Sequence, residues 1–274
     1  MPIQILDRNH YGREIRRPSS PGWNPTTHLA RMNFPGLGAR NAWIKLDPQF
    51  NAFAGNEAIG WLLARALEIP APAGAAFLIE DVAWFKKQLG DRYPSAAEGY
   101  PDAGELAAWC VTDMGVGSIR SVAPFDEWNL LAFLRTEEGA QIAAFDQWLG
   151  NTDRNNGNLL KLTGGRYAVI DHGILFCYED WRKAPIAPTE DSHLWREAQN
   201  LQRDRKLTLK EFKQLQSGMA EFGLSHHRVS GICHPVIEAI ISDLEGAPAA
   251  KNVLSCISER AAKDWIGRQV GVLI

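Results

Sequence analysis

The sequence feature that most constrains the fold is a polar segment, residues 150–158, that runs directly into a predicted β-hairpin, residues 159–170. The hairpin consists of two short apolar runs separated by a loop that contains two glycines. It ends in the tripeptide Asp-His-Gly at 171–173. Because the strands of a hairpin are antiparallel, we expect Asp171 to return to the side of Asn158, which precedes the first strand.

Asp153, Asn158 and Asp171 supply groups that phosphoryl transfer asks of a protein. That reaction needs a carboxylate near the attacking hydroxyl, hard oxygen ligands for Mg²⁺ on the phosphates of ATP, and cations against the developing charge. The five-residue step from Asp153 to Asn158 matches the D-x-x-x-x-N pattern of a kinase catalytic loop, and residues 171–173 match its metal-binding D-x-G. We therefore predict these three as catalytic residues, with Asn158 and Asp171 as metal ligands.

A plain turn is the alternative interpretation of residues 150–158, because Asn, Asp and Gly are the commonest turn residues. The strand that follows, and its Asp-His-Gly end, favour the functional interpretation. His172 stands where the common motif has Phe, and we interpret it as a packed core histidine.

The N-terminal part of the chain offers candidates for a phosphate-binding cation. Two strands are expected at 28–32 and 42–46, joined by a turn with one Pro and two Gly. Lys45 lies in the second strand, and Glu57 lies in the first turn of a helix that the apolar spacing predicts from residue 56. Kinases use a strand lysine fixed by a helical glutamate to hold ATP phosphates. Arg31, also in a predicted strand, is an alternative phosphate-binding cation. Lys45, Glu57 and Arg31 are also residue types that are common on protein surfaces without any binding role.

Residues 112–117 are predicted to connect two lobes, because two glycines there follow an apolar strand at 106–112. The backbone in that role would hydrogen-bond the adenine edge, although a simple turn fits almost as well. The residues predicted to do so are Thr112, Asp113 and Met114. The expected domains are an N-lobe, 1–114, and a C-lobe, 115–274.

The fold class predicted from all segments is α+β: a small, mainly β N-lobe with one key helix, and a larger helical C-lobe, as in protein kinases. Further strands are expected at 3–6 and 75–79, a loop at 10–27, a helix at 82–89 and a surface insertion at 90–104. The C-lobe helices are expected at 128–134, 139–149, 208–222, 234–245 and 251–267, the third opened by a capping box of Thr208 and Glu211.

Composition excludes several classes of function. A formal charge of −3 gives no overall basic field, which argues against duplex nucleic acid as a main partner. The four cysteines form no C-x-x-C pair, which favours free thiols in a reducing compartment, and the histidines near residue 230 fit no common zinc pattern. No signal peptide and no apolar run of bilayer length is visible, so we expect no membrane insertion and a cytoplasmic location.

The motif at 151–158, Asn-Thr-Asp-Arg-Asn-x-x-Asn, resembles that of HipA-like kinases and of type II phosphatidylinositol 4-kinases, which share an atypical kinase fold. The HipA-like group is the closer match, because Pro-Thr-Thr-His-Leu at 25–29 is similar to its N-lobe segment. Asn56-Glu57, before a Leu-rich helix, and Ile-Pro-Ala-Pro at 69–72 are also similar. The resemblance covers residues 22 to about 176.

The resemblance implies Asp153 as catalytic base, Asn158 and Asp171 as Mg²⁺ ligands, Lys45 as the phosphate lysine, and ATP as cofactor. In the HipA family the ATP lysine follows Thr-His directly, where this chain has Arg31, so Arg31 and Lys45 compete. The family's Ser-x-x-Gly phosphate loop is matched best by Ser-Ser-Pro-Gly at 19–22, where a serine would be a candidate for autophosphorylation.

The sequence thus predicts an ATP-dependent kinase that phosphorylates a Ser or Thr hydroxyl on a protein. A small-molecule or phosphatidylinositol-type kinase is the first alternative, and a lipid substrate would predict a basic or apolar membrane-facing patch, hinted at by Arg13, Arg16 and Arg17. A nucleotide-binding pseudokinase that acts by interaction is the second. The sequence leaves open the acceptor, an antitoxin-like partner and membership of a toxin–antitoxin system.

Overall fold

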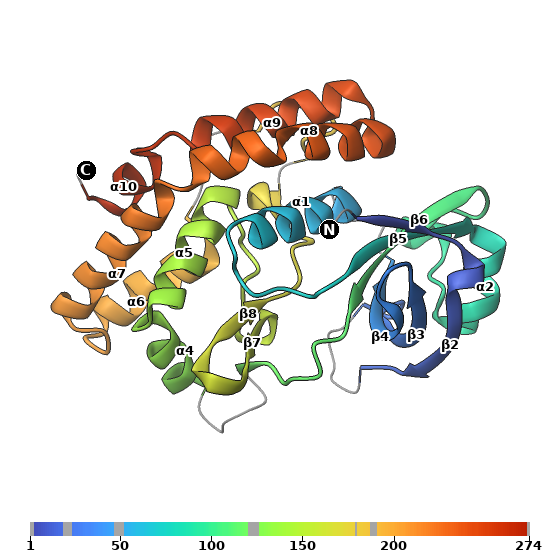
Figure 1. Ribbon diagram of the computed structural model, residues 1–274, viewed down its shortest axis with the longest axis horizontal. Coiled ribbons are helices and arrows are strands. Elements are labelled where there is room, and N and C mark those ends of the chain that lie inside the picture. Colours follow the sequence, from blue (N-terminus) through green and yellow to red (C-terminus); the bar gives the residue numbers. More distant parts are fainter. Residues whose placement is uncertain are drawn as a thin grey trace. The chain divides into compact units, whose positions relative to one another are not determined.

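The computed structural model describes residues 3–18, 24–46, 52–119, 126–178, 180–186 and 191–272. The chain divides into two compact units (Figure 1). The first comprises Met1–Ala58 and Pro72–Gly115, and the second comprises Ile59–Ala71 and Val116–Ile274. The predicted division after residue 114 gave residues 59–71 to the first lobe, whereas their contacts group them with the second unit.

The first unit is built on a six-stranded sheet in the order β1-β5-β6-β4-β3-β2. The strands are β1 (Gln4–Leu6), β2 (Tyr11–Arg16), β3 (His28–Phe34), β4 (Gly38–Lys45), β5 (Ala75–Asp81) and β6 (Glu105–Thr112). β1 is parallel to β5, and the other neighbours are antiparallel. One sheet face packs against α2 (Val82–Leu89) to form the core of the unit, with Met32, Ile44, Leu78, Cys110 and Phe85 buried there.

The predicted loop at 10–27 is wrong in its first part, because residues 11–16 form β2. Among the described residues, this strand is an edge of the sheet and pairs with β3. Its six residues include two arginines and a glutamate, and none is buried. Charged residues are common on edge strands, where they discourage pairing with other chains, but they remove the apolar alternation that reveals a strand.

The second unit is mainly helical around a short hairpin of β7 (Leu159–Lys161) and β8 (Tyr167–Val169). Helix α5 (Glu137–Leu149) has an almost wholly buried sequence and forms its core. The other helices of the unit are α4 (Asp126–Leu134), α6 (His193–Arg203), α7 (Leu209–Gly223), α8 (His226–Glu245), α9 (Ala247–Arg260) and α10 (Trp265–Val270). Helix α1 (Phe53–Ala66) begins in the first unit and continues in the second.

In the second unit, the helices differ from the predictions in three places. Helix α6 was not predicted, although Ser192 caps it and its buried residues recur at helical spacing. Helix α8 begins at 226 rather than 234, and it accommodates Pro235. The helix expected at 251–267 is two helices, because α9 ends at Arg260. The predicted capping box of Thr208 and Glu211 is confirmed at the start of α7. No helix among the described residues has the length and apolar character needed to cross a bilayer.

Candidate active site

The polar segment 150–158 connects α5 to the hairpin of the second unit. Gly150 ends α5 in the left-handed conformation, and Asn156–Asn158 form a short 3-10 turn before β7. β7 and β8 pair antiparallel with Leu159 opposite Val169, and the Ile170 amide donates to the Asn158 carbonyl at 3.2 Å. The hairpin is present as predicted, and it brings Asp171 back beside Asn158.

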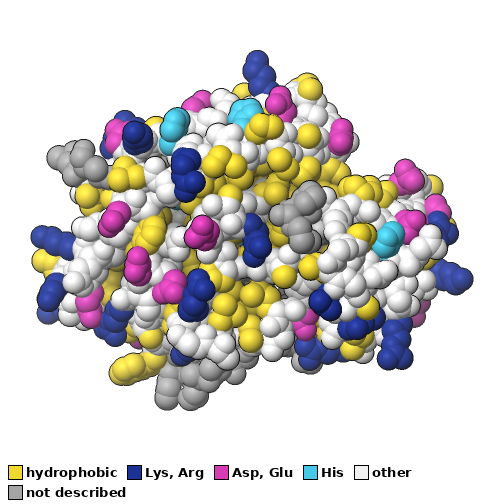
Figure 2. Space-filling model, viewed as in Figure 1, with side chains coloured by type: hydrophobic (Ala, Val, Ile, Leu, Met, Phe, Trp, Pro, Cys, Tyr) yellow, Lys and Arg dark blue, Asp and Glu magenta, His cyan; other side chains and the backbone are white. Residues whose placement is uncertain are grey.

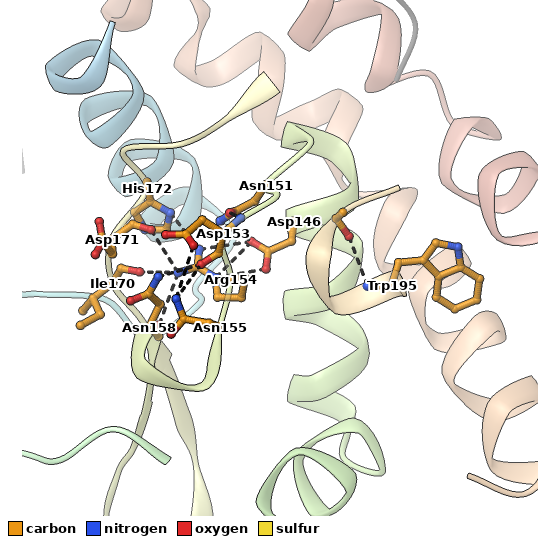
Figure 3. A network of polar contacts seen from close by, with 11 residues as sticks. Asp146, Asn151, Asp153, Arg154, Asn155, Asn158, Ile170, Asp171, His172 and Trp195 are labelled. Atoms are coloured by element: carbon orange, nitrogen blue, oxygen red, sulfur yellow. Dashed lines mark hydrogen bonds and ion pairs between the residues drawn. The ribbon is translucent and has the colours of Figure 1, made fainter. Parts of the chain in front are cut away.

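Arg154 connects the parts of this loop (Figure 3). Its guanidinium donates to both carboxylate oxygens of Asp146 in α5, with Nε to Oδ2 at 3.1 Å, and both side chains are fully buried. It also donates to the backbone carbonyls of Asn158, Ile170 and Asp171. One buried side chain therefore ties α5, the polar loop and the end of the hairpin together.

The side chains of Asp153 and Asn158 are held by the loop itself. Nδ2 of Asn158 donates to the Asp153 carbonyl at 2.8 Å, so its Oδ1 is the atom that remains for a ligand. Asn151 Oδ1 accepts from the Asp153 amide at 3.0 Å, and Asn155 Nδ2 donates weakly to the Asp153 carboxylate at 3.5 Å. The polar residues that resemble a plain turn thus position one carboxylate and one amide oxygen.

Asp171 has a left-handed backbone with φ of 63°. A non-glycine residue in that region costs on the order of 1 kcal/mol or more and persists only where the surroundings fix it. The surroundings fix Asp171 in two ways. The backbone carbonyls of Ile170 and Asp171 accept hydrogen bonds from Arg154. The next residue, His172, is buried, and its Nδ1 lies 3.0 Å from Arg154 Nη2. Strain of this kind is concentrated at functional sites.

The carboxylates of this site influence each other electrostatically. Burial raises the pKa of Asp153, and the nearby negative charge of Asp171 raises it further. Burial also raises the pKa of Asp146, which the Arg154 guanidinium counters. Asp153 therefore binds a proton more readily than an exposed aspartate, as a group that accepts one from an alcohol should.

In the first unit, Lys45 and Glu57 form a buried ion pair with Nζ 2.8 Å from Oε1. The lysine side chain is 12% exposed and the glutamate 2%. Glu57 is the fifth residue of α1, which starts at Phe53, so the prediction that it lies in the first helical turn is wrong. The pair places a fixed ammonium group at the end of β4.

The end of β4 is held by the segment 25–28. The hydroxyl of Thr26 donates to the Leu46 carbonyl at 2.6 Å and accepts from the Leu46 amide at 3.2 Å. Tyr100 also donates to that carbonyl, at 2.9 Å. Burial lowers the pKa of His28, whose Nδ1 lies 2.8 Å from the Thr26 carbonyl. The Pro-Thr-Thr-His sequence thus fixes the backbone next to Lys45.

The rival cation, Arg31, lies on the same sheet face as Lys45, because the β3–β4 register places it opposite Asn41 and side chains alternate along a strand. It is exposed, and Nη1 donates to Asn41 Oδ1 at 3.1 Å. The phosphate-loop candidate at 19–22 lies outside the described residues.

At the predicted hinge, two of the three candidate amides are already engaged. The Thr112 amide donates to the Gly74 carbonyl at 3.0 Å, and the Asp113 amide donates to the Asn41 carbonyl at 2.8 Å. Asp113 also accepts from Trp43 Nε1 at 3.2 Å. Of the three, the Met114 amide is the donor that the described residues leave for a nucleobase.

Neither Arg154 nor Asp146 had a predicted role. A carboxylate at 146, directly after the apolar run 142–145, was the available signal, because a buried charge needs a partner. That the partner lies eight residues later in the polar loop depends on the fold, and so does the contact of Arg154 with His172.

The oxygen donors of the second unit suit Mg²⁺ that arrives with a nucleotide. Mg²⁺ usually takes one or two protein oxygens together with phosphates and waters. Asn158 Oδ1 and the Asp171 carboxylate would provide those two. Within the described residues, no group of three or more His, Cys, Asp and Glu side chains is placed to hold a metal by itself.

No family model and no curated protein matches the sequence. A solved structure, described as the crystal structure of a Helicobacter pylori proinflammatory kinase CtkA, aligns over 98% of this chain and 99% of that chain, with a TM-score of 0.51 and 12% identity. At that identity the similarity shows the fold alone. The chain therefore has an α+β, two-lobed kinase-like fold, and the predicted fold class is confirmed.

Proposed function

We propose that this protein is an ATP-dependent kinase that transfers the γ-phosphate of ATP to a Ser or Thr hydroxyl of a protein. The observation that carries the proposal is the convergence of Asp153, Asn158 and Asp171 around Arg154 at one end of the hairpin. The kinase-like fold supports it. The resemblance of segments 25–28 and 151–158 to those of HipA-like kinases supports a kinase of that type. The proposal therefore includes an antitoxin-like protein as a partner.

Each residue has a defined task in the proposed reaction. Asp153 orients the attacking hydroxyl and accepts its proton as the oxygen bonds to phosphorus and ADP leaves. Asn158 and Asp171 would hold Mg²⁺, and the ion would supply positive charge against the phosphate oxygens. Lys45, fixed by Glu57, binds phosphate oxygens, and Arg154 keeps the loop in place without touching substrate. The backbone amide of Met114 would donate a hydrogen bond to the adenine edge.

The test is transfer of labelled γ-phosphate from ATP with Mg²⁺, using the protein alone, with cell lysate and with lipid extract. We expect label on protein Ser or Thr, and a loss of at least about 100-fold in Asp153→Asn, the range for removing a general base. Asp264→Asn is the matched control, because Asp264 is 58% exposed and pairs only with Arg268 in the described part of the chain. Label on lipid alone, or full transfer by Asp153→Asn, would refute the proposal.

A further inference from the structure

Helix α8 carries an exposed stripe that the fold of the second unit does not use. At successive helical turns this stripe, which we call the α8 stripe, consists of Arg228, Ile232, Pro235, Val236, Ala239 and Asp243. All six are exposed, with Ile232 60% and Val236 43% exposed. The stripe has a basic end, an apolar centre and an acidic end, over a length of about 22 Å at 1.5 Å per residue.

The opposite face of α8 already provides its packing. Its buried apolar residues are Val229, Cys233, Ile237 and Ile241, and α8 lies beside α9 along much of its length (Figure 1). A surface helix needs one apolar face, so a second apolar face on the same helix calls for a partner. Figure 2 shows hydrophobic side chains interspersed with charged ones over the α8 and α9 region of the visible face.

The pattern of the α8 stripe is complementary to itself when reversed. In an antiparallel pair of α8 helices with a two-fold axis beside Pro235 and Val236, Ile232 faces Ala239 of the other copy. Arg228 then faces Asp243 of the other copy at both ends. Within the described residues neither Arg228 nor Asp243 has an ion-pair partner, so both charges are available. A parallel pair would instead set like charges against each other at both ends.

We propose that the α8 stripe is a homodimer interface in which two copies pack antiparallel through α8. A two-fold interface uses the same patch on both subunits, which is what a self-complementary stripe provides. One helix from each copy buries less than the roughly 1,600 Å² of a standard interface. The dimer is therefore weak and forms with rising protein concentration.

Sedimentation of the full chain over a range of concentrations tests this proposal. We expect a monomer–dimer equilibrium that Arg228→Glu weakens at least about tenfold, because like charges then face each other twice. Asp243→Arg acts in the same way, and the double variant Arg228→Glu/Asp243→Arg restores dimerisation to within about threefold. Lys210→Glu is the control, because it makes an equal change of charge at an exposed position of α7. We expect this control to leave the monomer–dimer equilibrium unchanged.

A second variant separates the interface from folding. Val236→Cys lies next to the proposed axis, so under oxidising conditions it should give a disulfide-linked dimer whose unfolding temperature is no lower than that of the wild type. A protein that stays monomeric at all concentrations overturns the proposal. The proposal is also overturned if Arg228→Glu does not weaken the dimer, or if the double variant does not restore dimerisation. It is likewise overturned if a protein of different sequence is needed to cover the α8 stripe.

Discussion

At the scale of single residues, the buried pair of Arg154 and Asp146 shapes the proposed site. Both side chains are fully buried, and removing one partner leaves an uncompensated charge in the interior. We expect Arg154→Met to lower the free energy of unfolding by about 3–5 kcal/mol, measured by urea titration. Arg268→Met is the control, because its pair with Asp264 is exposed and should change the free energy by less than about 1 kcal/mol. Equal effects of the two substitutions would contradict the role given to Arg154.

The pKa of Asp153 tests whether Asp153 and Asp171 share one site. Since the Asp171 charge raises that pKa, Asp171→Asn should lower it, as followed by carboxyl NMR titration without metal or nucleotide. The control substitution Asp264→Asn should leave the pKa of Asp153 unchanged. A base acts only when ionised, so kcat/KM, which reports groups of the free enzyme, should fall as the pH drops through the pKa of Asp153. A pKa that rises or stays constant in Asp171→Asn would place the carboxylates in separate surroundings.

Spacing predicted which residues meet at this site because the connection is local. Asp153, Asn158 and Asp171 are joined by one loop and one hairpin, whose geometry follows from turn residues and apolar runs. The Lys45–Glu57 pair was also predicted, from a strand and the helix after it. The role of Arg154 was not, because it depends on contacts with α5 and His172 that only the folded chain creates.

At the scale of elements, α1 and the Asp-His-Gly turn fit closely at Gly60. A Cβ added there would lie 2.3 Å from Cβ and Cγ of His172. Alanine normally stabilises a helix interior relative to glycine by about 0.5–1 kcal/mol, but this clash should make Gly60→Ala destabilising by about 1–3 kcal/mol. The measurement is urea unfolding at low protein concentration.

Gly231→Ala is the matched control for Gly60→Ala, because nothing lies within 4 Å of an added Cβ at that position in α8. We expect this control to stabilise the protein by about 0.5–1 kcal/mol. If both substitutions stabilise the protein alike, α1 does not pack against His172.

The elements themselves were predictable where the side chains alternate or recur with a clear period. Helix α2 is of that kind, and β5 was recognisable as a continuous apolar run, residues 75–79, which is buried on both faces of the sheet for most of its length. β2 was missed because an edge strand with charged residues has no apolar face to detect. The start of α1 was placed three residues late, because Phe53, Ala54 and Gly55 give no capping signal.

At the scale of the whole molecule, the kinase-like fold is retained at 12% identity to a solved kinase. That is expected where a fold depends on the order of its elements and on which positions are apolar, while few side chains carry the chemistry. The two units hold different groups of predicted site residues. The first holds the Lys45–Glu57 pair, and the second holds the carboxylates and Asn158.

The central claim is that Asp153, Asn158 and Asp171 serve one magnesium–nucleotide site with different tasks. Calorimetric titration of ATP with Mg²⁺ into single-residue variants tests it most directly. We predict that Asp171→Asn and Asn158→Ala weaken Mg²⁺-dependent ATP binding at least about tenfold, whereas Asp153→Asn binds within about threefold of the wild type yet transfers phosphate at least about 100-fold more slowly. Wild-type binding by Asp171→Asn, or equal loss of binding in all three variants, would contradict the account.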